Sequence, residues 1–303
     1  MSLPAAPLGR VLTAMVTPFT SDGSVDLDAV AKVAEYLVDN GNDGLVVSGT
    51  TGEAPTTSAA EDGEILRVIL ETVGDRATVV AGIGTNDTRH SIELNEQAAK
   101  IGADGALLVT PYYNKPTQAG LVAHFEAVAA ASDLPIMLYD IPGRTGTTIA
   151  PETFAVLAEN EKFVAVKDAV GDLFRGARIM AETGLAFYSG DDVLNLGWLT
   201  HGGCGVVSVV GHVAGNQYAE MVAAVDAGDL PRALAVYNDL LPVVDAIMGQ
   251  APGVMTAKAA LQLIGVIDNR TVRLPHVQAD DQLVGVVHEA LANAGLLPTP
   301  ESN

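Results

Sequence analysis

Cysteine is almost absent from this sequence. Cys204 is the only one in 303 residues, which excludes an intrachain disulfide and fits a reducing compartment best. The N-terminus shows no charged segment followed by an apolar one, and no stretch offers about 18 uninterrupted apolar residues. We therefore expect a soluble, cytoplasmic protein.

Basic residues are also scarce. Sixteen Lys and Arg stand against 37 Asp and Glu, which gives a formal net charge of -21 at pH 7. Such a field repels phosphate backbones and anionic lipid, so neither nucleic acid nor a membrane is an expected partner. An anionic substrate would need positive charge that is placed locally.

Sequence motifs for metals and nucleotides are missing as well. The six histidines show no HxH or HExxH spacing, and one cysteine cannot form a thiolate cluster. No GxGxxG opens a helix after a strand, and GxxxxGK[ST] does not occur. We expect neither a metal nor another cofactor.

The sequence has instead a regular alternation of apolar, β-branched runs with helical segments. Eight such runs begin at positions 11, 44, 78, 105, 135, 163, 185 and 204, and a segment of helical periodicity follows each of the first seven. This alternation is typical of a parallel sheet covered by helices. It predicts an α/β fold, a (β/α)8 TIM barrel, with an open doubly wound sheet as the alternative.

The pattern changes after Val210. Residues 218–249 and 253–266 have helical periodicity with no strand between them. We therefore expect a (β/α)8 catalytic barrel over residues 1–228 and a C-terminal helical domain over residues 229–303.

Lys167 is unusual because it ends a buried strand, in the segment FVAVKDAVGD. Burying an ammonium costs several kcal/mol unless it is paired or loses its proton. Adjacent strand residues point to opposite faces, which disfavours a pair with Asp168. The neutral amine can attack a ketone and form a Schiff base, so Lys167 is a candidate nucleophile. A paired or rim-exposed lysine is the alternative.

Other polar residues follow the remaining strands, where a barrel of this type places its active site. The segments are GTTGE (49–53), TPYYNKP (110–116), YDIPGRTG (139–146) and SGDD (189–192). The two aspartates of the last segment, Asp191 and Asp192, are interpreted as a helix N-cap pair.

Schiff-base chemistry needs a proton shuttle, and hydroxyl groups are available for one. Tyr139 ends the strand next to that of Lys167, and Thr50, Thr51, Tyr112 and Tyr113 can form a relay. The backbone of GTTGE together with Thr51 can hold one carboxylate. Arg144 offers a bidentate fork for a second.

The four segments GTTGE, TPYYNKP, YDIPGRTG and VKDA, in this order, resemble the dihydrodipicolinate synthase family of pyruvate-dependent class I aldolases, which includes N-acetylneuraminate lyase. The resemblance runs from about Arg10 to about Leu297. It implies a (β/α)8 barrel with a C-terminal helical domain, assembled as a homotetramer (a dimer of dimers). It also implies a lyase that condenses pyruvate with L-aspartate 4-semialdehyde to give 4-hydroxy-tetrahydrodipicolinate, the first committed step of diaminopimelate and lysine biosynthesis.

The resemblance also implies the catalytic roles. Lys167 would form the Schiff base with pyruvate. Tyr139 would be the general acid and base, linked through Thr50 to Tyr113, which would reach the site from the neighbouring subunit.

Four further residues would bind the substrates. Thr51 would bind the carboxylate of pyruvate and Arg144 that of aspartate semialdehyde, while the backbone at Gly190 and Val207 would line the pocket. Asp140 departs from the family, in which many members have Asn at this position, and we expect no effect on the chemistry.

Regulation by lysine is expected to be weak or absent. Lysine-sensitive members of the family use two histidines and a glutamate, and the corresponding residues here are Ala59, Asp62 and His90. Asn86 and Tyr112 match the family.

Three other functions remain open. The first is an aldolase for a sialic acid or a 2-keto-3-deoxy sugar acid, against which Arg144 argues. The second is a non-catalytic barrel that binds a small acid, and the third is a metal-dependent aldolase, which the lack of a ligand cluster disfavours.

Overall fold

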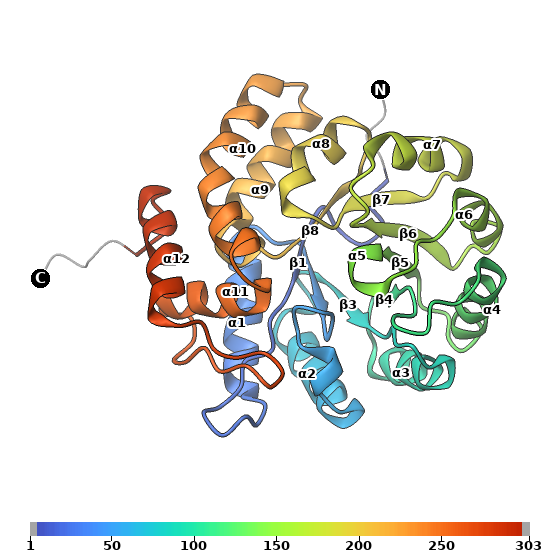
Figure 1. The fold of residues 1–303 in the computed structure, drawn as a ribbon, viewed down its shortest axis with the longest axis horizontal. Coiled ribbons are helices and arrows are strands. Elements are labelled where there is room, and N and C mark those ends of the chain that lie inside the picture. The colour runs from blue at the N-terminus through green and yellow to red at the C-terminus, as the bar shows by residue number, and fades with distance from the viewer. Residues whose placement is uncertain (1–4, 299–303) are drawn as a thin grey trace, which may run out of the picture.

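A closed barrel of parallel strands forms the centre of the molecule. The computed structural model describes residues 5–298, so residues 1–4 and 299–303, the outer ends of the two expected domains, lie outside the described residues. In the described part, each strand pairs with the next and β8 pairs with β1, which confirms the predicted (β/α)8 fold (Figure 1). The strands are β1 (Val11–Ala14), β2 (Gly44–Val47), β3 (Thr78–Gly82), β4 (Gly105–Val109), β5 (Ile136–Asp140), β6 (Phe163–Asp168), β7 (Ala186–Ser189) and β8 (Gly205–Ser208).

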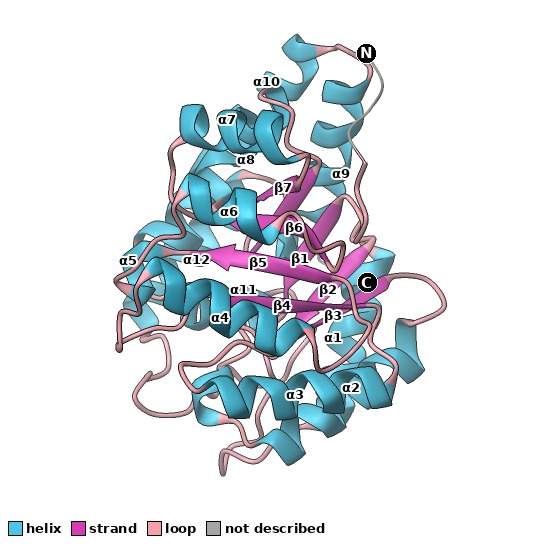
Figure 2. Ribbon diagram, turned by 90° about the vertical axis from the view of Figure 1, so that its right-hand side faces the viewer, coloured by secondary structure: helices cyan, strands magenta, loops and turns pink. Residues whose placement is uncertain are grey.

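Helices form the outer layer around the strands (Figure 2). They are α1 (Leu27–Asp39), α2 (Ala59–Val73), α3 (Thr88–Ile101), α4 (Gln118–Ala129), α5 (Pro142–Thr145), α6 (Pro151–Leu157), α7 (Leu173–Thr183), α8 (Asn195–Thr200), α9 (Gly211–Asp226), α10 (Leu230–Val244), α11 (Gly253–Leu263) and α12 (Asp281–Asn293). Short turns of 3-10 helix occur at Ala54–Thr56 and Asp192–Leu194, and a π-helical turn at Asp245–Gly249.

Local sequence fixes where several helices begin. Ser58 and Glu61 form a capping box at the start of α2, in which each side chain accepts the other residue's N–H. The side chains of Asp26, Thr117 and Asp172 cap α1, α4 and α7 in the same sense, each accepting from an N–H of the first turn. These caps satisfy N–H groups that have no partner inside the helix.

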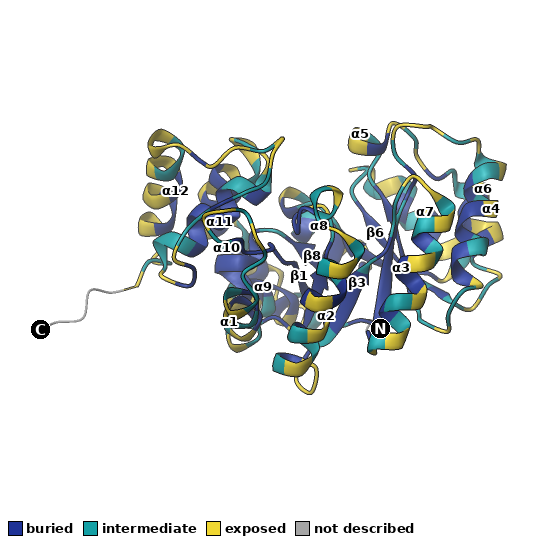
Figure 3. Cartoon of the chain, turned by 90° about the horizontal axis from the view of Figure 1, so that it is seen from below, coloured by how far each residue is buried: buried dark blue, intermediate teal, exposed yellow. Residues whose placement is uncertain are grey.

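The core has two layers because the strands are apolar on both faces. One face fills the barrel with residues such as Leu12, Val46 and Met137, and the other packs under the surrounding helices. The strands are coloured as buried over most of their length in Figure 3. This is why the strands are continuous apolar runs rather than alternating ones.

The last helices, α10 to α12, form a group beside the barrel, at one end of the molecule in Figure 3. α10 packs on α9, the helix that follows β8, around a buried cluster that includes Met221, Leu240 and Leu291. We propose the division between barrel and helical domain at residue 228, between these two helices. In the described residues, no helix is both long and apolar enough to cross a bilayer.

Candidate active site

A cavity of about 720 Å³ opens at the carboxyl ends of the strands. It brings together six of the eight predicted site residues, namely Thr50, Thr51, Tyr139, Arg144, Lys167 and Gly190. Val207 is buried in the barrel interior and is not among the lining residues, whereas Val209 is. Tyr113 lines a neighbouring cavity of about 380 Å³, which shares Thr50, Tyr139 and Arg144 with the first.

Lys167 lies in the wall of the larger cavity, at the end of β6, and is 5% exposed. Burial lowers its pKa to about 8; Asp192 opposes this shift and Arg144 adds to it. Asp168 points the other way, with its carboxylate 3.6 Å from Arg175, as strand alternation predicts. Neutral pH therefore lies closer to the pKa of Lys167 than to that of an ordinary lysine, so more of the amine is neutral and able to act as a nucleophile.

Tyr139 is directly opposite Lys167 in the pairing of β5 with β6. Nζ of Lys167 lies 4.3 Å from the centroid of the phenol ring. Burial raises the pKa of Tyr139 to about 12; Arg144 and a hydrogen bond to the Thr50 side chain lower it, and Asp191 raises it. The phenol is therefore protonated at neutral pH. It can donate a proton to the oxygen atom of an adduct formed when the amine of Lys167 adds to a carbonyl group.

Gly190 allows the turn after β7 to approach Lys167 closely. Its N–H donates to the carbonyl of Asp168 at 2.7 Å. A Cβ at this position would lie 2.9 Å from Cγ of Lys167 and 2.8 Å from the same carbonyl oxygen. A larger residue would displace either the lysine or the backbone.

The loop after β2 presents Thr50 and Thr51 to the cavity. Ser48 and Glu53, at the two ends of this loop, both have left-handed backbone conformations, with φ of 51° and 61°. Glu53 is fixed by Nζ of Lys258 at 2.6 Å and by the N–H of Arg273 at 2.8 Å. Conformations of this kind cost about 1 to 3 kcal/mol and persist only where the surroundings impose them.

Arg144 lies on the short helix α5 and is exposed, at the border of both cavities. Within residues 5–298, its guanidinium forms no ion pair with a carboxylate. This leaves the bidentate fork available to an anionic ligand.

Tyr113 projects from the loop after β4 and is 88% exposed. Its backbone is left-handed, with φ of 74°. The chain by itself therefore does not enclose this side chain.

Sequence reasoning misassigned Asp192. Asp191 caps the short 3-10 turn, as expected, because its carboxylate accepts from the N–H of Val193. Asp192 is instead buried and accepts from Val209 N at 2.9 Å, Val210 N at 3.1 Å and the hydroxyl of Ser208. It fixes the end of β8 and contributes negative charge near Lys167.

A second feature that the sequence did not reveal is the far wall of the larger cavity. Leu241, Val244, Asp245, Met248 and Gly249 line it, from the end of α10 and the π-helical turn that follows. Turns of this type are frequent at functional sites. The only available signal was a proline, Pro242, inside an otherwise helical stretch.

The residues expected for lysine regulation lie at or near the smaller cavity. Asp62, His90 and Tyr112 line it, whereas Ala59 and Asn86 do not. Asp62 already accepts a hydrogen bond from Thr57 at 2.8 Å, and burial raises its pKa. Both effects weaken the attraction of the Asp62 carboxylate for the ammonium group of a bound lysine.

The histidines of the described part of the chain do not form a cluster. His124 and His212 are buried separately, and burial lowers the pKa of each to about 4. Among the described residues, no group of three or more His, Cys, Asp or Glu is arranged to bind a metal ion.

The sequence matches the model of the dihydrodipicolinate synthetase family over residues 7–294. The chain belongs to this family. The resemblance inferred from the four motifs is thereby confirmed.

Named relatives cover nearly the whole chain. The 4-hydroxy-tetrahydrodipicolinate synthase of Kineococcus radiotolerans is 56% identical, over 98% of this chain and 96% of that protein. The enzyme of the same name from Acidothermus cellulolyticus is 58% identical, over 97% and 95%. A solved dihydrodipicolinate synthase from Acinetobacter baumannii, complexed with pyruvate, superposes with a TM-score of 0.92 at 37% identity, over 96% of this chain and 100% of that one.

Proposed function

We propose that this protein is a lyase that condenses pyruvate with L-aspartate 4-semialdehyde to give 4-hydroxy-tetrahydrodipicolinate, the first committed step of diaminopimelate and lysine biosynthesis. The observation that carries the proposal is the pairing of a buried lysine of lowered pKa with a tyrosine on the adjacent strand, in the wall of one cavity. The names of the relatives support the same reaction.

The first half of the reaction uses Lys167 and Tyr139. The neutral amine of Lys167 attacks C2 of pyruvate, and water leaves the carbinolamine to give a protonated imine. Loss of a proton from C3 then forms the enamine. Tyr139 donates and accepts protons in these steps, with Thr50 and Tyr113 as a relay. Thr51 and nearby loop N–H groups hold the pyruvate carboxylate, and the backbone at Gly190 and Val207 lines the pocket.

The second half forms the carbon-carbon bond. C3 of the enamine attacks the aldehyde carbon of aspartate semialdehyde, which re-forms the imine at Lys167, and the aldehyde oxygen takes a proton to become the 4-hydroxyl group. Arg144 holds the carboxylate of this second substrate. The amino group of the second substrate then attacks the imine carbon, closes the ring and releases Lys167. No cofactor is required, since the imine nitrogen itself accepts the electron pair.

Reduction with borohydride tests the mechanism. Incubation with pyruvate and borohydride should attach the reduced three-carbon unit to the peptide that contains Lys167. Lys258 is a matched internal control, because burial also lowers its pKa to about 8 but its ammonium pairs with Glu53, away from the cavity. A label on the Lys258 peptide, or none, contradicts the proposal.

We also propose that the enzyme is a homotetramer, a dimer of dimers, and that it acts in the cytoplasm. Apolar side chains such as Phe174, Leu230 and Leu234 are 75%, 51% and 49% exposed, which favours contact with another subunit. The exposed Tyr113 can reach a neighbouring site in such an assembly. A monomer with full activity, shown by sedimentation at assay concentration, would contradict this arrangement.

A further inference from the structure

Two carboxylates lie directly behind the candidate active site. Asp140 follows Tyr139 on β5 and Asp168 follows Lys167 on β6, and the two aspartates are opposite each other in the strand pairing. Both side chains are fully buried, and neither lines the cavity. Because successive strand residues point to opposite faces, these carboxylates lie on the outer face of the barrel wall.

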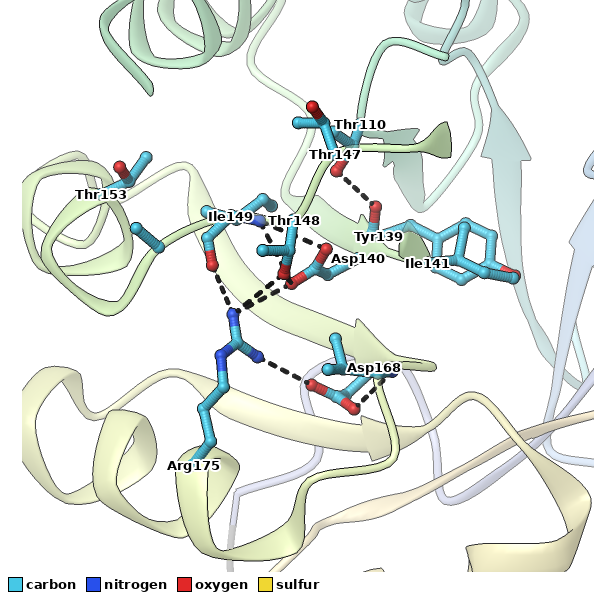
Figure 4. A network of polar contacts seen from close by, with 12 residues as sticks. Thr110, Tyr139, Asp140, Ile141, Thr147, Thr148, Ile149, Thr153, Asp168 and Arg175 are labelled. Carbon is cyan, nitrogen blue, oxygen red and sulfur yellow. Dashed lines mark hydrogen bonds and ion pairs between the residues drawn. The ribbon is translucent and has the colours of Figure 1, made fainter. Parts of the chain in front are cut away.

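Arg175, near the start of α7, bridges the two carboxylates (Figure 4). Its Nη2 donates to Oδ2 of Asp140 at 3.1 Å, whereas its Nη1 lies 3.6 Å from Oδ2 of Asp168, an ion pair without a hydrogen bond. Nη2 also donates to the carbonyl of Ile149. The backbone of Arg175 is fixed in turn, since its N–H donates to the capping carboxylate of Asp172 at 2.9 Å.

The cation between the strands stabilises the charged forms of the two buried carboxylates. Burial raises the pKa of both aspartates, to about 6 for Asp168, where the charge of Asp140 adds to the rise, and Arg175 opposes the shift in each. Within residues 5–298, no other ion pair reaches either carboxylate. The guanidinium is thus both the counter-ion and the only bridge between them in this part of the chain.

The bridge lies where backbone pairing of the two strands ends. The last backbone hydrogen bond there runs from the N–H of Ala169 to the carbonyl of Asp140, at 3.0 Å. One residue earlier on each strand are Tyr139 and Lys167, with Nζ 4.3 Å from the ring centroid. A shift of about 1 Å between reacting groups can change a rate by about a hundredfold.

We propose that Arg175 is a positioning residue that sets the separation of Tyr139 and Lys167, by joining the aspartates that follow them on β5 and β6. The inference rests on the proposed function of these two residues. Arg175 does not line the cavity, so it acts through the strands and not on the substrate.

The test compares the rate of pyruvate adduct formation, trapped with borohydride, in the parent and in two variants. Arg175→Lys keeps the positive charge but loses the planar fork. The double variant Arg175→Met, Asp168→Asn removes one negative charge with the cation, which limits the loss of stability. The control is Arg178→Met on the same helix, because Arg178 is exposed and its one ion pair within residues 5–298 is with the exposed Glu182.

We expect adduct formation at saturating pyruvate to slow at least about tenfold in both Arg175 variants, with the concentration of pyruvate for half-maximal rate changed less than about threefold. The control should stay within about twofold of the parent. A purely structural role predicts instead that variants which remain folded, by circular dichroism, react at the parental rate.

The outcomes separate this inference from the proposed function. Parental adduct rates in both folded Arg175 variants would overturn the inference alone. A parental rate in only one of the two folded variants would also overturn it, because the reaction would then proceed normally without the guanidinium. If that variant is Arg175→Lys, positive charge alone suffices and Arg175 acts only as a counter-ion. Failure of the parent to form an adduct at Lys167 would instead reject the proposed function.

Discussion

Replacing Lys258 with methionine should destabilise the protein by about 3 to 5 kcal/mol, because it leaves a buried carboxylate without its cation. Nζ of Lys258 lies 2.6 Å from Oε1 of Glu53 and 2.7 Å from the carbonyl of Thr271, and both charged side chains are 1% exposed. The ammonium also lies 4.2 Å from the ring centroid of Phe19. In the variant, Glu53 would keep the hydrogen bond from the N–H of Arg273 but no ion pair.

The matched control is the double variant Glu53→Gln, Lys258→Met. It removes both charges, while the glutamine can still accept from the N–H of Arg273. Neutral replacement of a buried pair is often tolerated, so we expect the double variant to lie within about 2 kcal/mol of the parent. The two substitutions should therefore be strongly non-additive.

Urea unfolding, followed by far-UV and near-UV circular dichroism at pH 7 and at one fixed protein concentration, measures this difference. Coincidence of the two transitions establishes that a single unfolding free energy applies. A loss below about 1 kcal/mol in Lys258→Met, or a double variant no more stable than that single variant, would refute the reasoning.

Three further predictions concern the reaction and its regulation. Because burial lowers the pKa of Lys167 to about 8, the rate of adduct formation should rise about tenfold from pH 6 to pH 7 and level off above about pH 8. A rate of borohydride trapping that does not depend on pH would contradict this. Arg144→Ala should form the pyruvate adduct normally but lose about 2 to 4 kcal/mol of transition-state binding with aspartate semialdehyde. Equal kcat/KM for aspartate semialdehyde in variant and parent would argue against binding of its carboxylate by Arg144. Lysine should inhibit only above about 1 mM at saturating pyruvate, and a half-maximal effect at lower concentration in an initial-rate titration would show that Asp62 and its neighbours bind it well.

The sequence alone determined the fold class and most of the candidate site. Apolar runs that alternate with helical segments specify a parallel barrel, and in such a barrel the carboxyl ends of all strands meet at one rim. This is why Lys167, Tyr139, Thr51 and Arg144, which are far apart in the chain, could be assigned to one cavity before their positions were known.

Tertiary structure decided the contacts that hold this site in place. The ion pair of Lys258 with Glu53 joins residues 205 positions apart, and the ion pair from Arg175 to Asp140 depends on where the start of α7 lies relative to the end of β5. The wall formed by the end of α10 likewise depends on the packing of that helix beside the barrel. Periodicity reports which face of an element is apolar, but it carries no information on which distant polar group that face will meet, because packing geometry alone sets those distances.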